Sequence, residues 1–380
     1  MKTKMSTSDE EILQRLNYEE AKQYVGGVVF VTLIMIAGVV GNLHVLFVYA
    51  FRIKPSNHQV FILTLGVLDF TTCVIGMPFI LVDLRHPLTF TLIAACKLLR
   101  FVNYFICMSS GLLLVVIAID RYRKICVPFG RQMSLTQAKI SCAVVLGVSL
   151  LISWPAPVLY GRDTIVTSDV NINGTRCYEE DRFHGTKYMA YFNALLILVF
   201  FSALIILAVL YSLIWRKIKN HSATKKKFSQ KETESGTSTA MSVVTTSGSN
   251  SCSKGEKNDV SSDENIPEKV VSKGNNVLPH SAKCSEGNDQ RASRTTVMFL
   301  LITAVFLLSY FPHLLLKIIT FLNKGFVENM TFTGKVFYNT FIWCFFINNM
   351  ANAFIYGFFD RRFRSEVKSM YSKLFSYGKK

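Results

Sequence analysis

The chain has 380 residues, of which half are hydrophobic and 13% aromatic, and it carries a formal net charge of +17 at pH 7. Its lysines and arginines lie mainly between apolar stretches rather than on one helix face with interleaved aromatic residues, which excludes a nucleic-acid-binding protein. The nine cysteines lack the paired spacings of a zinc site or a disulfide-rich scaffold. This composition favours a protein that crosses a membrane.

Residues 1–23 are polar and of mixed charge, without the features of a cleavable signal peptide. We expect them to form an extracellular N-terminus. The apolar stretch that follows is then expected to act as an uncleaved signal-anchor.

Seven apolar segments follow, each longer than the roughly 20 residues that a helix needs to cross a bilayer. Because lipid cannot satisfy backbone hydrogen bonds, segments of this length must be helical. We predict an all-α fold, a seven-transmembrane helix bundle with helices 1–5 in residues 24–216 and helices 6–7 in residues 294–358. The expected spans are 24–51, 59–82, 97–124, 137–160, 188–215, 295–322 and 335–358.

Lysine and arginine are concentrated after the first, third, fifth and seventh spans. Cytoplasmic loops of membrane proteins carry this excess of positive charge. The pattern places the N-terminus outside the cell and the C-terminus inside. We expect a multi-pass protein of the plasma membrane.

Residues 217–293 are rich in Ser, Thr, Lys, Gly and Asn and show no hydrophobic periodicity. A segment of this composition cannot bury a core. We predict a disordered third cytoplasmic loop, whose serines and threonines are candidate phosphorylation sites.

Residues 359–380 follow the last span and place apolar side chains three and four residues apart. This spacing is typical of an amphipathic helix that lies on a membrane surface. We predict a short amphipathic C-terminal helix on the inner leaflet, followed by a short cytoplasmic tail.

The third span ends in the triplet Asp120-Arg121-Tyr122, one helical turn below its last apolar residues. An ion pair at the edge of the hydrocarbon is costly, which favours a functional site over a simple stop-transfer cluster. With Pro128 and Phe129 further along, this stretch resembles the third helix of rhodopsin-like (class A) G-protein-coupled receptors. In that family the triplet is the cytoplasmic switch.

The resemblance covers nearly all of the chain outside the third cytoplasmic loop and implies a receptor rather than an enzyme. It places Pro128 and Phe129 in the loop that docks a heterotrimeric G protein. It also implies that Tyr211 and Tyr356 turn toward the released Arg121 on activation. Receptor kinases and arrestin are further candidate partners of such a receptor.

The resemblance also implies a disulfide bond between Cys96, at the outer end of the third span, and Cys177, in the loop after the fourth. Extracellular thiols are usually paired, and two free thiols are the alternative. The sequons at Asn173 and Asn329 lie on the same predicted outer side, as N-glycosylation requires.

Several polar residues lie inside the apolar spans, where they are costly unless they have partners or a function. By the resemblance, residues around Asp69 in the second span would hold a sodium ion, the only cofactor expected. A hydrogen-bond network without an ion is the alternative. The predicted network consists of Asn42, Asp69, Ser110, Asn348 and Asn352.

Some motif positions depart from the family pattern. Ala203 and Ala353 stand where the fifth and seventh spans usually carry proline, and Tyr310 stands where the sixth usually carries tryptophan. Without these prolines we expect spans 5 and 7 to be straight. The acid that often pairs with the triplet's arginine from the sixth span is also missing, which leaves Asp120 as the only expected restraint on Arg121.

The outer halves of the third, sixth and seventh spans should line a ligand pocket. Because Asn103 replaces the aspartate of amine receptors and Phe346 the retinal lysine of opsins, neither an amine nor retinal is expected. The basic residues Arg100 and Lys317 suggest that the ligand carries an acidic group, and contact with lipid headgroups is the alternative. The acidic residues that follow Cys177 would instead attract basic groups of a ligand. The predicted pocket residues are Arg100, Asn103, Tyr104, Cys107, Glu179, Tyr310, His313, Lys317 and Tyr338.

A ligand that meets both signs of charge is more easily a peptide than a small molecule, so we predict a neuropeptide-type receptor. A receptor for an acidic small molecule or lipid and a non-signalling decoy are the alternatives. A transporter would show a repeat of spans, which this chain lacks. A membrane enzyme would need a nucleophile and a base, for which Cys107 and His313 are the only candidates.

Overall fold

The computed structural model describes the backbone of residues 7–167, 172–235, 281–323 and 325–377, with side chains described up to Asn220 and again from Arg294. The chain divides into two compact units, Met1–Ile218 with Arg291–Lys380, and Lys219–Gln290. The functional residues discussed below all belong to the first unit.

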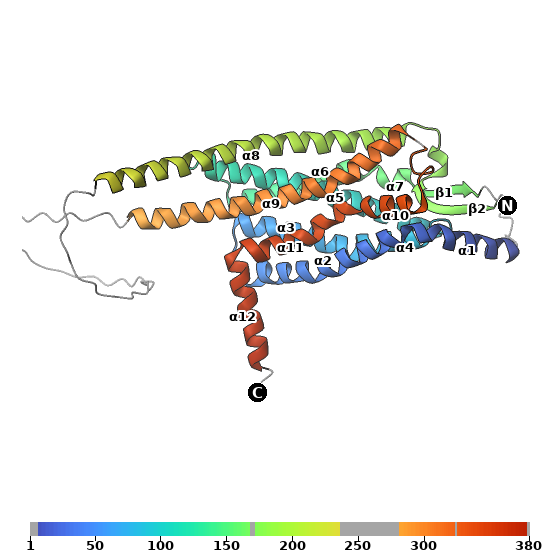
Figure 1. Cartoon of the computed structure of the whole chain (residues 1–380), viewed down its shortest axis with the longest axis horizontal. Coiled ribbons are helices and arrows are strands. Elements are labelled where there is room, and N and C mark those ends of the chain that lie inside the picture. Colours follow the sequence, from blue (N-terminus) through green and yellow to red (C-terminus); the bar gives the residue numbers. More distant parts are fainter. Residues whose placement is uncertain (1–6, 168–171, 236–280, 324, 378–380) are drawn as a thin grey trace, which may run out of the picture. The chain divides into compact units, whose positions relative to one another are not determined.

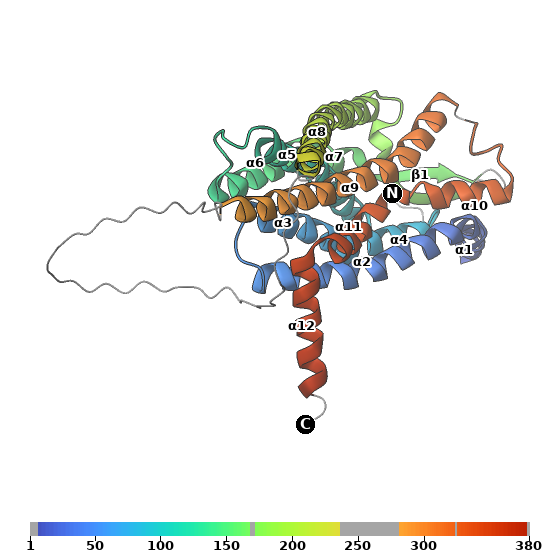
Figure 2. The same cartoon turned by 60° about the vertical axis from the view of Figure 1, so that its left-hand side comes forward.

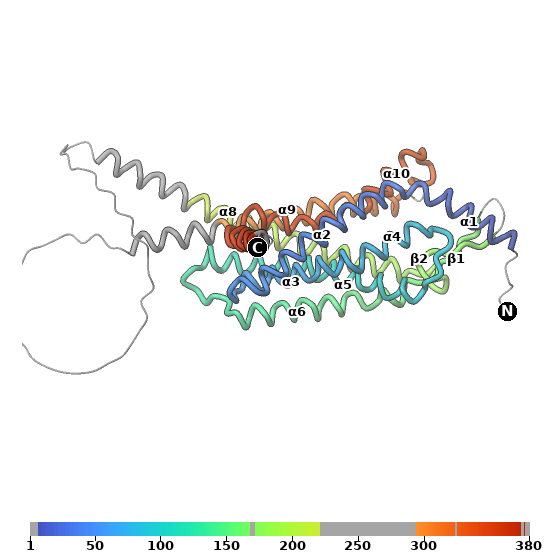
Figure 3. Tube along the Cα trace, turned by 90° about the horizontal axis from the view of Figure 1, so that it is seen from below, coloured from blue at the N-terminus to red at the C-terminus, as the bar shows by residue number. Residues whose placement is uncertain are grey.

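Seven helical segments among the described residues are long and apolar enough to cross a membrane. The predicted all-α bundle is therefore confirmed, and its helices lie side by side in Figures 1 and 3. The membrane-spanning elements are α2 (Val25–Phe51), α3 (Asn57–Thr71) with α4 (Met77–Arg85), α5 (Ile93–Cys126), α6 (Leu135–Ser153) with α7 (Ala156–Leu159), α8 (Tyr188–Ser235), α9 (Ser281–Leu322), and α10 (Phe332–Phe341) with α11 (Ile347–Phe359).

The bundle buries one stripe of each helix and leaves the rest facing outward. Leu113, Leu114 and Ile117 of α5 are at most 1% exposed, so this helix lies at the centre of the core. Large apolar side chains such as Leu308 and Phe358 are more than 70% exposed. Such exposure is typical of a surface that faces lipid, where apolar side chains are not in contact with water.

An N-terminal helix precedes the first span, which the sequence analysis did not predict. Helix α1 (Thr7–Ala21) continues through a 3-10 turn, η1 (Lys22–Tyr24), into α2. The Asn17 side chain is buried, accepts a hydrogen bond from the Leu88 backbone N–H (3.0 Å) and donates one to the Arg85 carbonyl (3.2 Å). These two bonds fasten α1 to the loop between α4 and α5.

The second span is not one regular helix. A π-helical turn, η2 (Thr72–Gly76), separates α3 from α4, and Pro78 lies in the first turn of α4. Proline lacks the N–H that a regular helix would use, and its ring conflicts with the preceding turn. A π turn is one way to absorb that conflict.

The seventh span is broken although Ala353 has replaced its usual proline, so the prediction of a straight span 7 is wrong. Between α10 and α11 the chain turns through Ile342 and Trp343 into a 3-10 segment, η4 (Cys344–Phe346). The freed Ile342 carbonyl lies 2.6 Å from His313 Nδ1 of α9. A tertiary contact thus satisfies the backbone where the helix is interrupted. By contrast, α8 is an uninterrupted helix, as expected without proline.

A small antiparallel hairpin is the one addition to the helical fold in the described part of the chain. Strand β1 (Tyr160–Val166) pairs with β2 (Asn173–Glu179), with Tyr160 opposite Glu179. The hairpin lies at the same end of the bundle as α1 and α10 (Figures 1 and 2). This end corresponds to the predicted outer side.

The other end of the bundle carries α12 (Arg361–Tyr377), the predicted amphipathic helix, which turns away from the bundle axis (Figures 1 and 2). The prediction of a disordered loop over residues 217–293 is wrong at both of its ends, because α8 extends to Ser235 and α9 begins at Ser281. Residues 236–280, its centre, lie outside the described residues.

Candidate functional site

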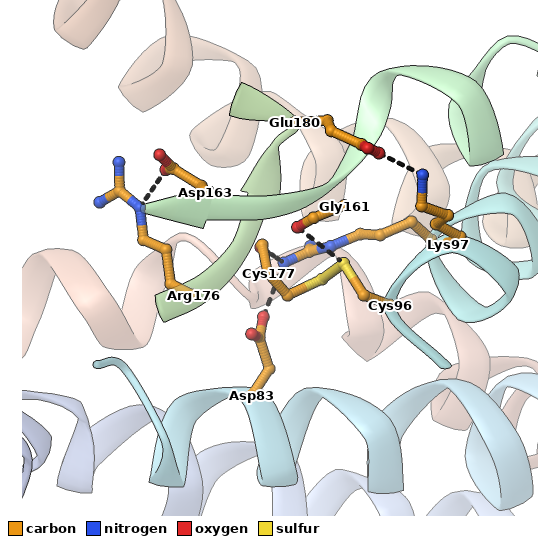
Figure 4. The surroundings of a disulfide bond; sticks show 9 residues. Asp83, Cys96, Lys97, Gly161, Asp163, Arg176, Cys177 and Glu180 are labelled. Atoms are coloured by element: carbon orange, nitrogen blue, oxygen red, sulfur yellow. Dashed lines mark hydrogen bonds and ion pairs between the residues drawn. A yellow bond between two sulfur atoms is a disulfide. The ribbon is translucent and has the colours of Figure 1, made fainter. Parts of the chain in front are cut away.

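The outer end of the bundle is covered by the hairpin, which a disulfide fastens to α5. Cys96 and Cys177 are bonded, with their Cα atoms 5.7 Å apart, and both are buried. The predicted pairing is confirmed. Figure 4 shows two further attachments around this bond: the ion pair of Lys97 with Glu180, and that of Asp163 with Arg176 (2.5 Å) across the two strands.

Arg100 is part of this attachment and is not the unpaired cation that the sequence suggested. Its Nη2 donates to Asp83 Oδ2 of α4 (2.6 Å) and to the Cys177 carbonyl of β2 (3.1 Å). The guanidinium also lies over the rings of Phe79 and Tyr160, at 5.7 and 5.6 Å. The charge of Arg100 therefore joins α4, α5 and the hairpin, and the interpretation as a ligand-carboxylate clamp needs correction.

Lys317 differs from Arg100 because no ion pair neutralises it among the described side chains. It is exposed and lies one turn above His313 on α9. Of the two basic residues in the predicted pocket, Arg100 and Lys317, only Lys317 is available for an anionic group of a ligand.

The acidic residues after Cys177 also divide into paired and unpaired groups. Glu180 pairs with Lys97, and both carboxylate oxygens of Asp181 accept hydrogen bonds from Thr164 (2.7 Å each). Burial raises the pKa of Asp181, but these hydrogen bonds outweigh it and hold that pKa below its usual range. Glu179 is half-buried and has no ion pair in the described part of the chain, so it is the acid free to meet a basic ligand.

The remaining predicted pocket residues of α5 and α9 are mostly buried. The Tyr310 hydroxyl donates to Cys107 Sγ (3.1 Å), and its ring lies 4.5 Å from that of Phe306. Because His313 is bonded to a backbone carbonyl instead, Cys107 and His313 are not brought together as nucleophile and base. The tyrosine at the tryptophan position therefore forms a polar link between α5 and α9.

Two more predicted pocket residues lie on the inward face of α5. The hydroxyls of Tyr104 and Tyr160 are 2.6 Å apart. The Asn103 Oδ1 is buried without a hydrogen-bond partner among described atoms. A Cβ placed on Gly76 would lie 2.4 Å from that oxygen, so the π turn and Asn103 pack closely. Tyr338 of α10 is half-buried at the same end.

A buried polar cluster lies in the middle of the bundle. Asp69 is 0% exposed, and its two carboxylate oxygens accept hydrogen bonds from Asn349 (3.0 Å) and Asn352 (2.8 Å). Asn42 donates to the carbonyls of Gly38 (2.9 Å) and Asn349 (2.7 Å). Asn349 was not in the predicted network, although it stands beside Asn348 in the sequence and could have been included on that ground.

Several oxygens of this cluster have no donor. Ser110 Oγ, Asn348 Oδ1 and Asn352 Oδ1 are buried without a hydrogen-bond partner in the described part of the chain. Unpaired buried oxygens are costly. These oxygens and the Asp69 carboxylate are ligands of the kind that hard cations prefer, so the residue types present fit a sodium ion.

At the inner end, Arg121 and Asp120 form a buried ion pair between adjacent residues of α5. Asp120 also accepts from Lys124 (3.0 Å) and from Asn57 Nδ2 (3.2 Å). On its other side the guanidinium of Arg121 lies over the Phe299 ring of α9, 5.3 Å from the ring centroid. Arg121 therefore has a contact on α9 in addition to the Asp120 pair that the sequence shows.

The two predicted tyrosines are not hydrogen-bonded to Arg121 among the described residues. The Tyr211 hydroxyl donates to the Phe299 carbonyl (3.3 Å) and lies 3.1 Å from Thr303 Oγ1. Tyr356 is fully buried against Tyr49, and its hydroxyl has no partner among described atoms. Neither tyrosine contacts the arginine in this conformation.

The loop after the triplet presents an apolar side chain outward. Phe129, next to Pro128, is fully exposed. The loop itself is held by the Gln132 amide, which donates to the Val127 carbonyl (2.8 Å). Tyr122 is half-buried against the core. The sequons Asn173 and Asn329 are both exposed at the other end of the bundle.

Asp360, between α11 and α12, is a polar junction that the sequence analysis missed. Its Oδ2 accepts from the Tyr49 hydroxyl (2.6 Å) and lies 3.1 Å from His58 Nε2, while Oδ1 accepts from the Arg362 N–H (2.8 Å). Burial raises the pKa of Asp360, but the hydrogen bonds from His58 and Tyr49 outweigh it and hold that pKa far below its usual range. Asp360 stands directly before α12, a position at which aspartate commonly caps a helix.

Comparison with known proteins agrees with this arrangement. The neuropeptide S receptor of Mus musculus is 28% identical over 197 residues, 50% of each chain, and the C3a anaphylatoxin chemotactic receptor of Oncorhynchus mykiss is 27% identical over 206 residues, 51% of this chain and 54% of that one. The chain spans about half the length of the curated relatives it matches.

Squid rhodopsin has the same fold, with a TM-score of 0.64 at 18% identity, covering 93% of this chain and 87% of the other. The family model described as 7 transmembrane receptor (rhodopsin family) matches residues 41–356. This match takes in all seven spans in whole or in part, the polar cluster and the Asp120-Arg121 pair, so the chain belongs to the rhodopsin family of seven-transmembrane receptors, which are signalling receptors and not enzymes.

Proposed function

We propose that this receptor lies in the plasma membrane with its N-terminus outside, binds an extracellular peptide and activates a heterotrimeric G protein. The observation that carries the proposal is the inner end of α5, where a buried Arg121 is paired within its own helix and a fully exposed Phe129 follows. A buried arginine with partners that can be exchanged is suited to a switch, and an exposed apolar side chain is suited to docking.

Activation would exchange the partners of Arg121. When the inner end of α9 moves outward, Phe299 leaves the arginine, and the Tyr211 hydroxyl is freed from its bond to the Phe299 carbonyl. The unpaired Tyr356 hydroxyl is available to the same region. The cleft so opened would accept a G-protein segment, with Phe129 inserted beside it.

A peptide ligand is supported by two predicted pocket residues, Lys317 and Glu179, whose side chains have no ion pair among the described residues. Lys317 can bind an anionic group and Glu179 a basic one, while neighbouring charges are paired within the protein. Two relatives are named as receptors for neuropeptide S and for the C3a anaphylatoxin. An acidic small molecule or lipid would need Lys317 but not Glu179.

We also propose that the cluster around Asp69 holds a sodium ion in the resting receptor. Asp69, Ser110, Asn348 and Asn352 would supply its oxygen ligands, because the last three have oxygens without donors. The ion would supply the positive charge that the buried carboxylate lacks.

Ligand-stimulated nucleotide exchange tests the function. Cells expressing the receptor are screened with a neuropeptide library and a library of acidic small molecules and lipids, with calcium and cyclic AMP as readouts. Hits are then measured on purified receptor with purified G protein. Arg121→Ala should abolish exchange and leave ligand binding unchanged, since Arg121 lies about 27 Å along α5 from Asn103. Exchange that survives this substitution at normal surface expression contradicts the proposal.

A further inference from the structure

The partner of Arg121 on α9 is an aromatic ring and not a carboxylate. Phe299 is 0% exposed in α9, and its ring centroid lies 5.3 Å from the guanidinium carbon. A guanidinium within about 6 Å of an aromatic face is attracted by the negative potential of that face, more strongly when water is excluded. The Phe299 ring therefore attaches α9 to the switch arginine without any acid.

A second group holds the Phe299 ring from α3. The His58 ring contacts it edge-on, with centroids 5.4 Å apart and planes at 77°. His58 Nε2 in turn lies 3.1 Å from Asp360 Oδ2, which also accepts from the Tyr49 hydroxyl. A continuous chain of contacts thus runs from the start of α12 through His58 and Phe299 to Arg121.

This chain is built from side chains with little solvent contact. The Asp360 and His58 side chains are 11% and 22% exposed, and Tyr49 is fully buried and stacked on Phe363 of α12 with centroids 5.8 Å apart. Three elements, α2, α3 and α12, therefore fix the position of one imidazole. The edge-on contact of His58 in turn fixes the Phe299 ring beside the Arg121 guanidinium.

We propose that Phe299 is the second restraint on Arg121 in the resting receptor, and that Asp360 is a positioning residue that acts on it through His58. The inference rests on the proposed G-protein function, because restraint of Arg121 affects signalling only if Arg121 is the switch. Weakening either contact shifts the population toward the released arginine.

Graded fluorination of Phe299 separates an electrostatic role from a steric one. One, two and three ring fluorines reduce the negative potential of the ring face stepwise and change its shape little. Ligand-free exchange by reconstituted full-length receptor should rise with each fluorine, to roughly tenfold, which corresponds to about 1.4 kcal/mol. The same series at Phe354, which is 50% exposed on α11, should have no effect. A flat response at Phe299 overturns the cation–π restraint.

A double-mutant cycle tests the route from Asp360. Asp360→Asn and Phe299→Leu should each raise ligand-free exchange. Because both act on one contact, the double variant should rise by less than the product of the single effects. Independent effects would show that Asp360 does not act through Phe299.

The fluorine resonance of a fluorophenylalanine at position 299 reports the same contact without ligand or G protein. In the purified full-length receptor, Asp360→Asn should shift or split this resonance, whereas Phe354→Leu should not. A resonance that Asp360→Asn leaves unchanged overturns the proposal. If the resonance moves while neither Arg121→Ala nor Asp120→Asn alters exchange, the contact chain stands and the proposed function fails.

Discussion

The two ends of the bundle each contain an arginine–aspartate pair, buried at the inner end and partly buried at the outer end, and the two pairs are built in opposite ways. At the outer end Arg100 and Asp83 are 17 positions apart, on α5 and α4, and Arg100 also bonds to the disulfide-linked strand β2. At the inner end Arg121 and Asp120 are neighbours on one helix. Helix movement would break the first pair, but it would leave the second intact.

This difference indicates which charge each end can use for function. A pair that joins separate elements stabilises their arrangement, and removing one partner leaves a buried charge uncompensated. The bond between Asp120 and Arg121 lies within one helix and does not itself join α5 to another element, so the arginine can change its other partners as α9 moves. The proposed ligand would therefore meet other charges at the outer end, where Lys317 and Glu179 have no ion pair among the described side chains.

Breaking the outer pair should have the largest effect. Arg100→Gln leaves the partly buried Asp83 without its ion pair, which should cost up to about 3 kcal/mol of stability. We expect a large drop in the thermal unfolding temperature of the purified receptor and poor surface expression. Arg162→Gln, at an exposed position of β1, is the matched control. Normal stability combined with weaker binding of acidic peptides would instead make Arg100 a ligand contact.

Lys317→Gln should affect binding and leave folding unchanged. A charge-assisted contact is worth about 1.5–3 kcal/mol, or roughly ten- to a hundred-fold in affinity. If the C-terminal carboxylate of the peptide is the partner of Lys317, the substitution should weaken binding of the free-acid peptide by that factor. Binding of the amidated peptide should not change. Loss only on Asp→Asn or Glu→Gln substitution in the peptide would identify a side-chain carboxylate. Lys139→Gln, at an exposed position of α6, is the control. An equal loss of affinity for every form of the peptide would rule out a carboxylate contact.

Asp120→Asn should loosen the inner pair by a smaller amount, because Phe299 still contacts Arg121. We expect ligand-free nucleotide exchange to rise roughly tenfold, or about 1.4 kcal/mol. Thermal stability should change little, in contrast to Arg100→Gln. Unchanged exchange at normal expression would show that the pair does not restrain the switch.

Asp69→Asn should have the smallest effect, since amide groups already occupy both carboxylate oxygens. If sodium binds there, it should weaken agonist binding by about 1 kcal/mol, roughly fivefold, in the unmodified receptor. The substitution should abolish this sodium dependence. Agonist affinity that is indifferent to sodium in the unmodified receptor would identify a network without an ion.

Local sequence properties determined the spans, the all-α class and the amphipathic α12. Length, apolarity and three- to four-residue spacing are properties of single segments, so they survive any arrangement of the neighbours. The Asp120-Arg121 pair was also visible, because both residues are adjacent. The Cys96–Cys177 bond was expected from the family resemblance and is present.

Only the tertiary structure decided which charges are paired and where helices break. Arg100 meets Asp83, and His58 meets Asp360 across 302 positions. The seventh span is interrupted where the Ile342 carbonyl accepts a hydrogen bond from His313 Nδ1. These contacts depend on how each helix is rotated and how far it is displaced along its neighbour. Hydrophobic periodicity does not fix the rotation or the displacement of a helix to within the length of a hydrogen bond. The sequence therefore could not show that Arg100 is neutralised by Asp83.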